Sequence, residues 1–175
     1  MTAFVIWGLL TVYWKALRQF DAFELIGHRI VWASLLLAVA LTVTRRLGSV
    51  VHALRTPRTA WLLALASVLL AANWTSYVYA VVHGRVVETA LGYFIAPVGT
   101  MLIGVLVLGE QLRPRQWFAL GLAIAAGVVL TSAYGRIPWL ALCIAVSWCA
   151  YGYLKKRVPL RPMESLAGET WLLFI

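Results

Sequence analysis

The sequence predicts an all-α integral membrane protein, built as a bundle of hydrophobic helices. Of its 175 residues, 63% are hydrophobic and only 12% are charged, which leaves too little polar surface for a soluble domain of this length. Several stretches without a charged residue or histidine reach the roughly 20 residues that a membrane-spanning helix needs. The basic residues behind the formal net charge of +9 lie between these stretches. We therefore interpret them as topology signals and not as a nucleic-acid-binding surface.

The apolar stretches give the expected helices in order. Residues 2–14 are too short to cross a bilayer alone and predict a shortened first helix. A second helix is expected over 25–44, with His28 and Arg29 in its first turns. Four later stretches have full length: 59–82, 89–109, 116–135 and 137–154. The run 170–175 predicts the beginning of a seventh helix, and the short connections leave no room for an extramembrane domain.

The distribution of basic residues predicts the orientation of the helices. The connections at 45–58, 110–115 and 155–161 hold ten lysines and arginines, whereas the alternate connections hold three. Basic residues are enriched in cytoplasmic loops. We therefore expect a multi-pass protein of the cytoplasmic (inner) membrane, with its N-terminus in the cytoplasm.

A weak pattern repeats along the chain at an offset of 140–141 residues. The matched pairs are Trp7 with Trp148, Lys15 with Lys156, Glu24 with Glu164, and Arg29 with Glu169. Five spans separate the two copies, so the second copy would have the inverted topology that is common among secondary transporters. A chance match is the alternative explanation for a similarity this thin.

Short segments spread over the chain carry a family resemblance. They are FVIWGLLTVYWKAL at 4–17, ELIGHRIVW at 24–32, Asn73-Trp74, LGYFIAP at 91–97, LGE at 108–110, Gln116-Trp117 and YGYLKKR at 151–157. Through them the chain resembles RarD-type proteins of the EamA family, in the drug/metabolite transporter superfamily, over nearly its whole length. The resemblance implies a ten-helix fold of two inverted five-helix repeats, and permease function. On that pattern residues 1–135 form the first repeat, with its first helix shortened, and 136–175 form the start of a truncated second repeat.

Asn73 is the most informative polar residue, because it lies near the middle of a predicted span. An amide at that depth must hydrogen-bond within the protein or line a water-filled cavity. It predicts either a substrate contact or a clasp between helices. Trp74 is adjacent and Tyr77 follows one turn later on the same face, which gives a polar and aromatic surface suited to an amphiphilic solute.

The next span carries a second candidate face. Tyr93, Pro97, Thr100 and Gly104 follow at i, i+4, i+7 and i+11, so they share one side of a helix. Tyr93 and Thr100 are predicted to line the substrate cavity, and Pro97, which removes a backbone hydrogen bond, is predicted to act as a hinge. Close helix packing through small residues is the alternative.

Three ionisable residues at the predicted outer side could form a gate. Arg29 and Glu88 could pair across two helices, or Arg29 could bind an anionic solute, or it could extend its side chain to the membrane surface. His28 could couple transport to protons.

No catalytic motif of the HExxH, GxSxG or Walker type is present. We therefore expect a protein that is not an enzyme and needs no metal or cofactor. The predicted function is a secondary permease that moves a small metabolite or amphiphilic drug-like solute across the bilayer by alternating access. The alternative is a non-transporting membrane subunit or a non-functional fragment of such a permease. A reading frame that continues through three more spans would favour the permease.

Overall fold

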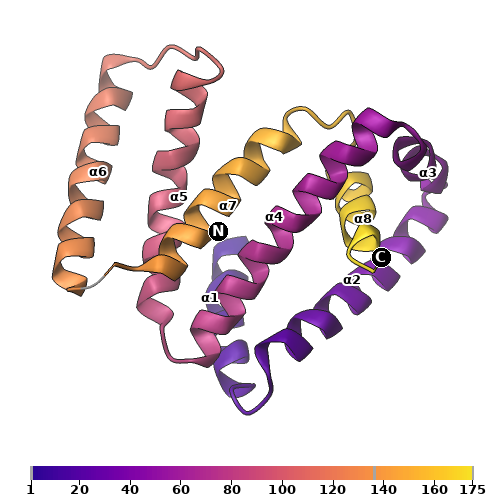
Figure 1. Cartoon of the computed structure of the whole chain (residues 1–175), viewed down its shortest axis with the longest axis horizontal. Helices are drawn as coiled ribbons and strands as arrows, with labels where there is room; N and C mark the ends of the chain where they lie inside the picture. The colour runs from indigo at the N-terminus through magenta and orange to yellow at the C-terminus, as the bar shows by residue number, and fades with distance from the viewer. Residues whose placement is uncertain (1, 136, 175) are drawn as a thin grey trace.

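The computed structural model describes residues 2–135 and 137–174, which form helices joined by short turns (Figure 1). The helices are α1 (Thr2–Ala16), α2 (Ala22–Val43), α3 (Leu47–Arg55), α4 (Pro57–Val82), α5 (Val86–Leu106), α6 (Pro114–Tyr134), α7 (Trp139–Lys155) and α8 (Pro162–Leu172). Helices α2, α4, α5 and α6 are long and apolar enough to cross a membrane, and the 17-residue α7 is a shorter apolar helix. The predicted fold class, an all-α membrane bundle, is confirmed.

Local sequence signals set the helix ends. Asp21 caps α2, because its side-chain oxygen accepts a hydrogen bond from the backbone N–H of Phe23 at 2.8 Å. Pro57, Pro114 and Pro162 stand at the first positions of α4, α6 and α8, where the missing N–H would have had no partner within the helix.

Two helices differ from the sequence expectation. Helix α3 was expected to be a connection, but it buries Val50 and Ala53 against the bundle. Helix α8 begins at Pro162 and not near residue 170, and it buries Glu164 and Glu169. Helix α3 was missed because it has only nine residues, and α8 was missed because the search for charge-free stretches rejects a helix whose glutamates are buried or capping.

Helices α5 and α7 pack closely through small residues. Gly92, Ala96 and Gly99 follow at i, i+4 and i+7 on α5 and face α7. A Cβ atom on Gly92 would lie 2.9 Å from the backbone oxygen of Ala141, and one on Gly99 would lie 2.7 Å from Sγ of Cys149. We call this contact the α5–α7 seam. It is formed by Gly92, Ala96 and Gly99, and not by the face of Tyr93, Pro97, Thr100 and Gly104 that the sequence singled out.

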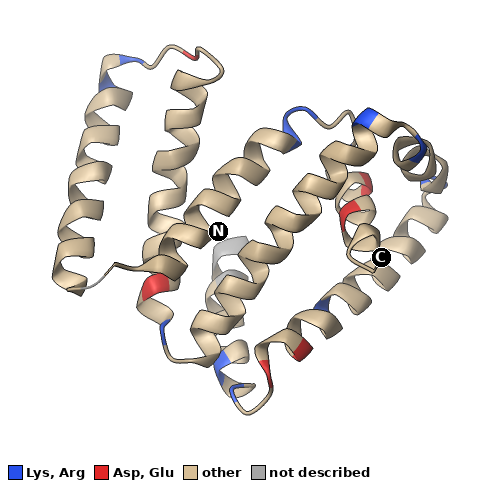
Figure 2. Cartoon of the chain, in the orientation of Figure 1, with Lys and Arg blue, Asp and Glu red and all other residues tan. Residues whose placement is uncertain are grey.

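Helix α4 crosses the centre of the bundle, with α7 on one side and α2 and α8 on the other (Figure 1). Among the helices that the structure describes, α6 packs on α5 alone, and it keeps large apolar side chains exposed, such as Phe118 at 70% and Val129 at 64%. Figure 2 shows most of the charged residues near the ends of the helices. The apolar middle and charged ends are what a bilayer requires of a protein surface.

The predicted hinge residue Pro97 lies inside α5, which stays helical from Val86 to Leu106. Pro97 is exposed on the side of α5 away from the seam residues. Its role as a hinge stays a prediction.

Candidate functional site

Asn73 joins three helices through its side-chain amide. The residue is 1% exposed. Its amide nitrogen donates to the backbone oxygen of Ile144 at 3.0 Å and to Oγ of Ser147 at 3.1 Å, both on α7. Its amide oxygen accepts a hydrogen bond from the hydroxyl of Tyr93 on α5 at 3.3 Å. Both amide hydrogens are thus used within the protein, as expected of a clasp between helices.

Two tyrosines extend this polar centre toward α1. The rings of Tyr77 and Tyr93 meet edge to face, with centroids 5.8 Å apart. The hydroxyl of Tyr77 lies 3.0 Å from Oγ1 of Thr11 on α1. Tyr93 also meets Trp148 of α7 at 6.2 Å between centroids. Polar and aromatic groups from α1, α4, α5 and α7 therefore converge at one place in the bundle.

Arg29 reaches the same place from α2. Its guanidinium lies over the ring of Trp74 at 4.2 Å from the centroid and near the ring of Trp14 at 5.9 Å, a stacking geometry that stabilises a cation. Among the described residues it makes no hydrogen bond or ion pair. A small void of about 20 Å³ lies between Arg29, Trp14, Trp74 and the two tyrosines. We call Arg29, Trp74, Tyr77 and Tyr93 the aromatic–arginine cluster.

A larger cleft of about 790 Å³ opens beside this cluster, between α1 and α2. Arg29 and Trp14 line both the cleft and the small void. Exposed His28 and Glu24 and the aromatic ring of Trp32 also border it. The guanidinium of Arg29 thus stands between the cleft and the polar centre of the bundle.

The predicted contact between Arg29 and Glu88 is not made. Glu88 is fully buried and binds Arg85, three residues earlier, with 2.5 Å between Nη2 and the carboxylate. The hydroxyl of Tyr134 on α6 donates to the same carboxylate oxygen at 2.5 Å. The carboxylate hydrogen bond raises the pKa of the Arg85 guanidinium. Glu88 lies in the first turn of α5, close to Arg85 in the preceding connection. It therefore pairs with Arg85 and not with Arg29 on α2.

Thr100 lies apart from the aromatic–arginine cluster. Its hydroxyl donates to the backbone oxygen of Ala96 at 2.9 Å and lies 3.6 Å from Sγ of Cys149. It borders the α5–α7 seam and is exposed. The structure therefore brings Asn73, Trp74, Tyr77 and Tyr93 together and leaves Thr100 at another level of the bundle.

Sequence reasoning missed a buried polar network between α7 and α8. The carboxylate of Glu169, 0% exposed, accepts hydrogen bonds from Lys155 at 2.8 Å and Ser165 at 2.6 Å on one oxygen, and from the hydroxyl of Tyr151 at 2.8 Å on the other. Buried charges in membrane helices are rare and are commonly functional. The repeat pattern along the chain provides one signal for this residue, because it matches Glu169 with Arg29. In the structure, each of the two stands at the eighth position of its helix, α8 and α2 respectively.

Within the described part of the chain, no three side chains of His, Cys, Asp or Glu come close enough to share a metal ion. The polar and aromatic groups that the site offers are one guanidinium, aromatic rings and hydroxyl groups.

Comparison with known proteins identifies the family. The profile of the EamA-like transporter family matches residues 1–133. The protein RarD of Streptomyces exfoliatus is 44% identical over 99% of this chain and 55% of its own length. An uncharacterized transporter of Vibrio cholerae is 38% identical over 97% of this chain and 56% of its own length.

The protein RarD of Escherichia coli is 32% identical over 99% of this chain and 59% of its own length. The chain spans little more than half the length of these curated relatives. No solved structure matches it significantly. The matched profile and the RarD relatives are consistent with the helical bundle that the structure shows. The chain belongs to the EamA-like transporter family, within which it is of the RarD type.

Proposed function

We propose that this chain is part of a secondary transporter that moves a small metabolite or amphiphilic solute across the cytoplasmic membrane by alternating access. Its family and its helices of membrane length support the transporter class. Two inverted repeats packed around a central site are the usual basis of alternating access. The first repeat would be residues 1–135, and 136–175 would begin the second.

One observation carries the proposal: a guanidinium inside a membrane helix has aromatic faces but no anionic partner among the described residues. A cation within a membrane-spanning helix costs free energy, and such residues usually have a function or reach water. Arg29 lies at the boundary between a cleft of about 790 Å³ and the polar centre of the bundle. A solute with an anionic group in the cleft would supply the missing charge.

The neighbouring side chains suggest how the rest of the solute would bind. Trp74, Tyr77 and Tyr93 offer aromatic faces to an apolar or aromatic body. Asn73 would stabilise this arrangement through its hydrogen bonds to α5 and α7. It would contact the solute directly only if those hydrogen bonds broke. Thr100 would meet a solute that has moved farther along α5. His28 borders the cleft and is our candidate for coupling to protons.

The proposed orientation places the N-terminus in the cytoplasm. Figure 2 supports it, because the connections after α3, α5 and α7, which carry basic residues, lie toward one end of the bundle. A reporter enzyme fused after Arg58 should report a cytoplasmic location for that position. An exported reporter at that position would refute the orientation.

The transport proposal is tested with the complete protein, as its gene encodes it, in proteoliposomes. A panel of anionic, neutral and cationic amphiphilic compounds is presented under an imposed ion gradient, and accumulation is measured. We expect uptake of anionic members, and a loss of at least about tenfold in the R29Q variant, the usual effect of removing one charged contact. The matched control is R18Q, which removes an exposed arginine at the same end of the bundle.

The outcomes separate two claims. If the wild-type protein accumulates no compound under any gradient, the transporter proposal fails. If it accumulates anionic compounds and R29Q equals R18Q, transport stands and the assignment of Arg29 fails.

A further inference from the structure

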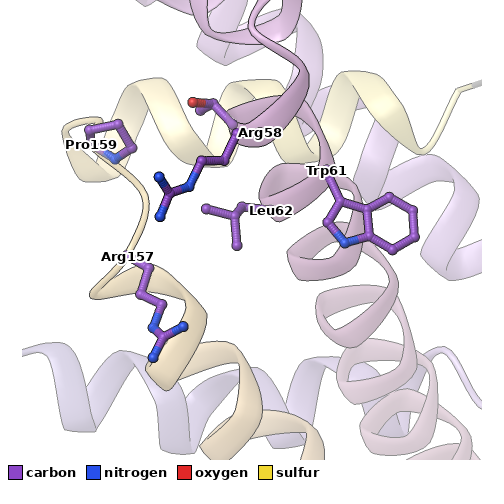
Figure 3. Close-up of a pocket in the computed structure, with 6 residues that line it drawn as sticks. Arg58, Trp61, Leu62, Arg157 and Pro159 are labelled. Carbon is purple, nitrogen blue, oxygen red and sulfur yellow. The ribbon is translucent and has the colours of Figure 1, made fainter.

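A second hollow lies far from the aromatic–arginine cluster, at the ends of α4 and α7 (Figure 3). It has a volume of about 600 Å³ and is lined by Arg58, Thr59, Trp61, Leu62, Arg157 and Pro159. Figure 3 shows the two arginines coming from different elements on either side of Leu62, with the Arg157 side chain turned along α7. Arg58 comes from the first turn of α4, and Arg157 from the segment after α7.

The hollow carries two positive charges and no negative one. None of its lining residues is acidic. Both arginines are exposed, and neither forms an ion pair within the described residues. The guanidinium of Arg157 lies 4.5 Å from the ring centroid of Tyr153, which fixes its position without neutralising it. Two guanidinium forks at one opening match the oxygens of a phosphate group, which each can bind through two hydrogen bonds.

An apolar track leads from this opening along α4. Trp61, Leu65 and Val68 follow at i, i+4 and i+7, so they lie on one face of the helix. Their exposed fractions are 70%, 40% and 61%. Trp61 also lines the hollow, and tryptophan commonly marks the membrane–water boundary. A soluble phosphate would use only the charged end, whereas a phospholipid would use the charged end and the track.

We propose that this hollow is a binding site for an anionic phospholipid. Its phosphate lies between Arg58 and Arg157, and an acyl chain lies along Trp61, Leu65 and Val68. A zwitterionic lipid is disfavoured because the lining holds no carboxylate to receive its amine. Basic pockets between membrane helices bind acidic headgroups in this way. The inference depends on membrane insertion alone and is independent of the solute.

The test uses the complete protein, purified with native lipids and then exchanged into mixtures of phosphatidylglycerol and phosphatidylethanolamine. Native mass spectrometry measures which lipid is retained. We expect the wild type to prefer phosphatidylglycerol, and the R58Q/R157Q variant to lose about 30-fold in that preference, the combined effect of two basic residues near an anionic surface. The matched control is R113Q/R115Q, which removes two exposed arginines from the connection between α5 and α6.

A second measurement follows the acyl chain. Phosphatidylglycerol with brominated chains should quench the fluorescence of Trp61, measured as the difference between the wild type and W61F because the chain has nine tryptophans. Brominated phosphatidylcholine should quench this component less.

The outcomes that overturn the proposal are distinct. Equal lipid preference in R58Q/R157Q and R113Q/R115Q would show that general surface charge, and not the hollow, selects the lipid. Binding of inorganic phosphate to the arginine pair, with no lipid preference and no quenching of Trp61, would assign the hollow to a soluble anion. The R157Q single variant gives an intermediate loss if the pair acts together, and no loss would refute that pairing.

Discussion

Replacing Asn73 by leucine tests whether the amide at the centre of the bundle is a clasp. Leucine has a similar volume but cannot replace the hydrogen bonds to Ile144, Ser147 and Tyr93. Hydrogen bonds between membrane helices contribute about 0.6 kcal/mol each on average. Three such bonds predict that N73L lowers the free energy of unfolding by about 2 kcal/mol.

The measurement is reversible unfolding in mixed micelles of a mild detergent and sodium dodecyl sulfate, followed by circular dichroism. A double-mutant cycle with S147A isolates one of the three bonds, because Ser147 accepts from the Asn73 amide at 3.1 Å. We expect a coupling free energy of about 0.6 kcal/mol between the two positions.

Two results would refute this reasoning. An N73L variant as stable as the wild type would mean that the amide does not hold the helices together. A coupling of zero with S147A would mean that the bond between the two side chains adds nothing to stability. If folded N73L also loses transport while its stability is unchanged, the amide acts on the solute and not on the bundle.

Two further predictions concern helix contacts. G92A should destabilise the protein by about 1–3 kcal/mol, because the new methyl group overpacks the α5–α7 seam. G121A on α6, where a Cβ meets nothing within 4 Å, should be neutral in the same unfolding assay, and equal effects would contradict the seam. E169Q should cost about 2–3 kcal/mol, since it leaves the ammonium of Lys155, only 23% exposed, without its ionised partner. E110Q, which breaks an exposed pair, should change stability by less than about 1 kcal/mol, and a similar loss in both variants would argue against the buried network.

Most of the fold could be predicted because a bilayer imposes a simple rule on sequence. The predicted spans 59–82, 89–109 and 116–135 match α4, α5 and α6 within three residues at each end. A helix crossing hydrocarbon must be apolar over about 20 residues. The rule fails for α3, which has only nine residues, and for α8, whose glutamates make polar contacts that no count of apolar residues includes.

The candidate site could be predicted in part. Asn73, Tyr77 and Tyr93 were selected because each is polar or aromatic in the middle of an apolar span, and the structure brings them together. Which helices pack against one another was not available from periodicity. Glu88 therefore has a partner in its own loop, and Arg29 has a partner in a tryptophan of α4.

The α5–α7 seam also reports on movement. Because the seam glycines leave no free space between α5 and α7, we expect the two helices to move as one rigid body, although they belong to different predicted repeats. The thiol of Cys149 is buried there and lies 3.2 Å from the backbone oxygen of Ala96, whereas Cys143 on the same helix is exposed. Any motion that parts the two helices would uncover Cys149. The protein thus carries its own pair of chemical probes on α7, Cys143 outside the seam and Cys149 inside it, and only the second should change its accessibility when the seam opens.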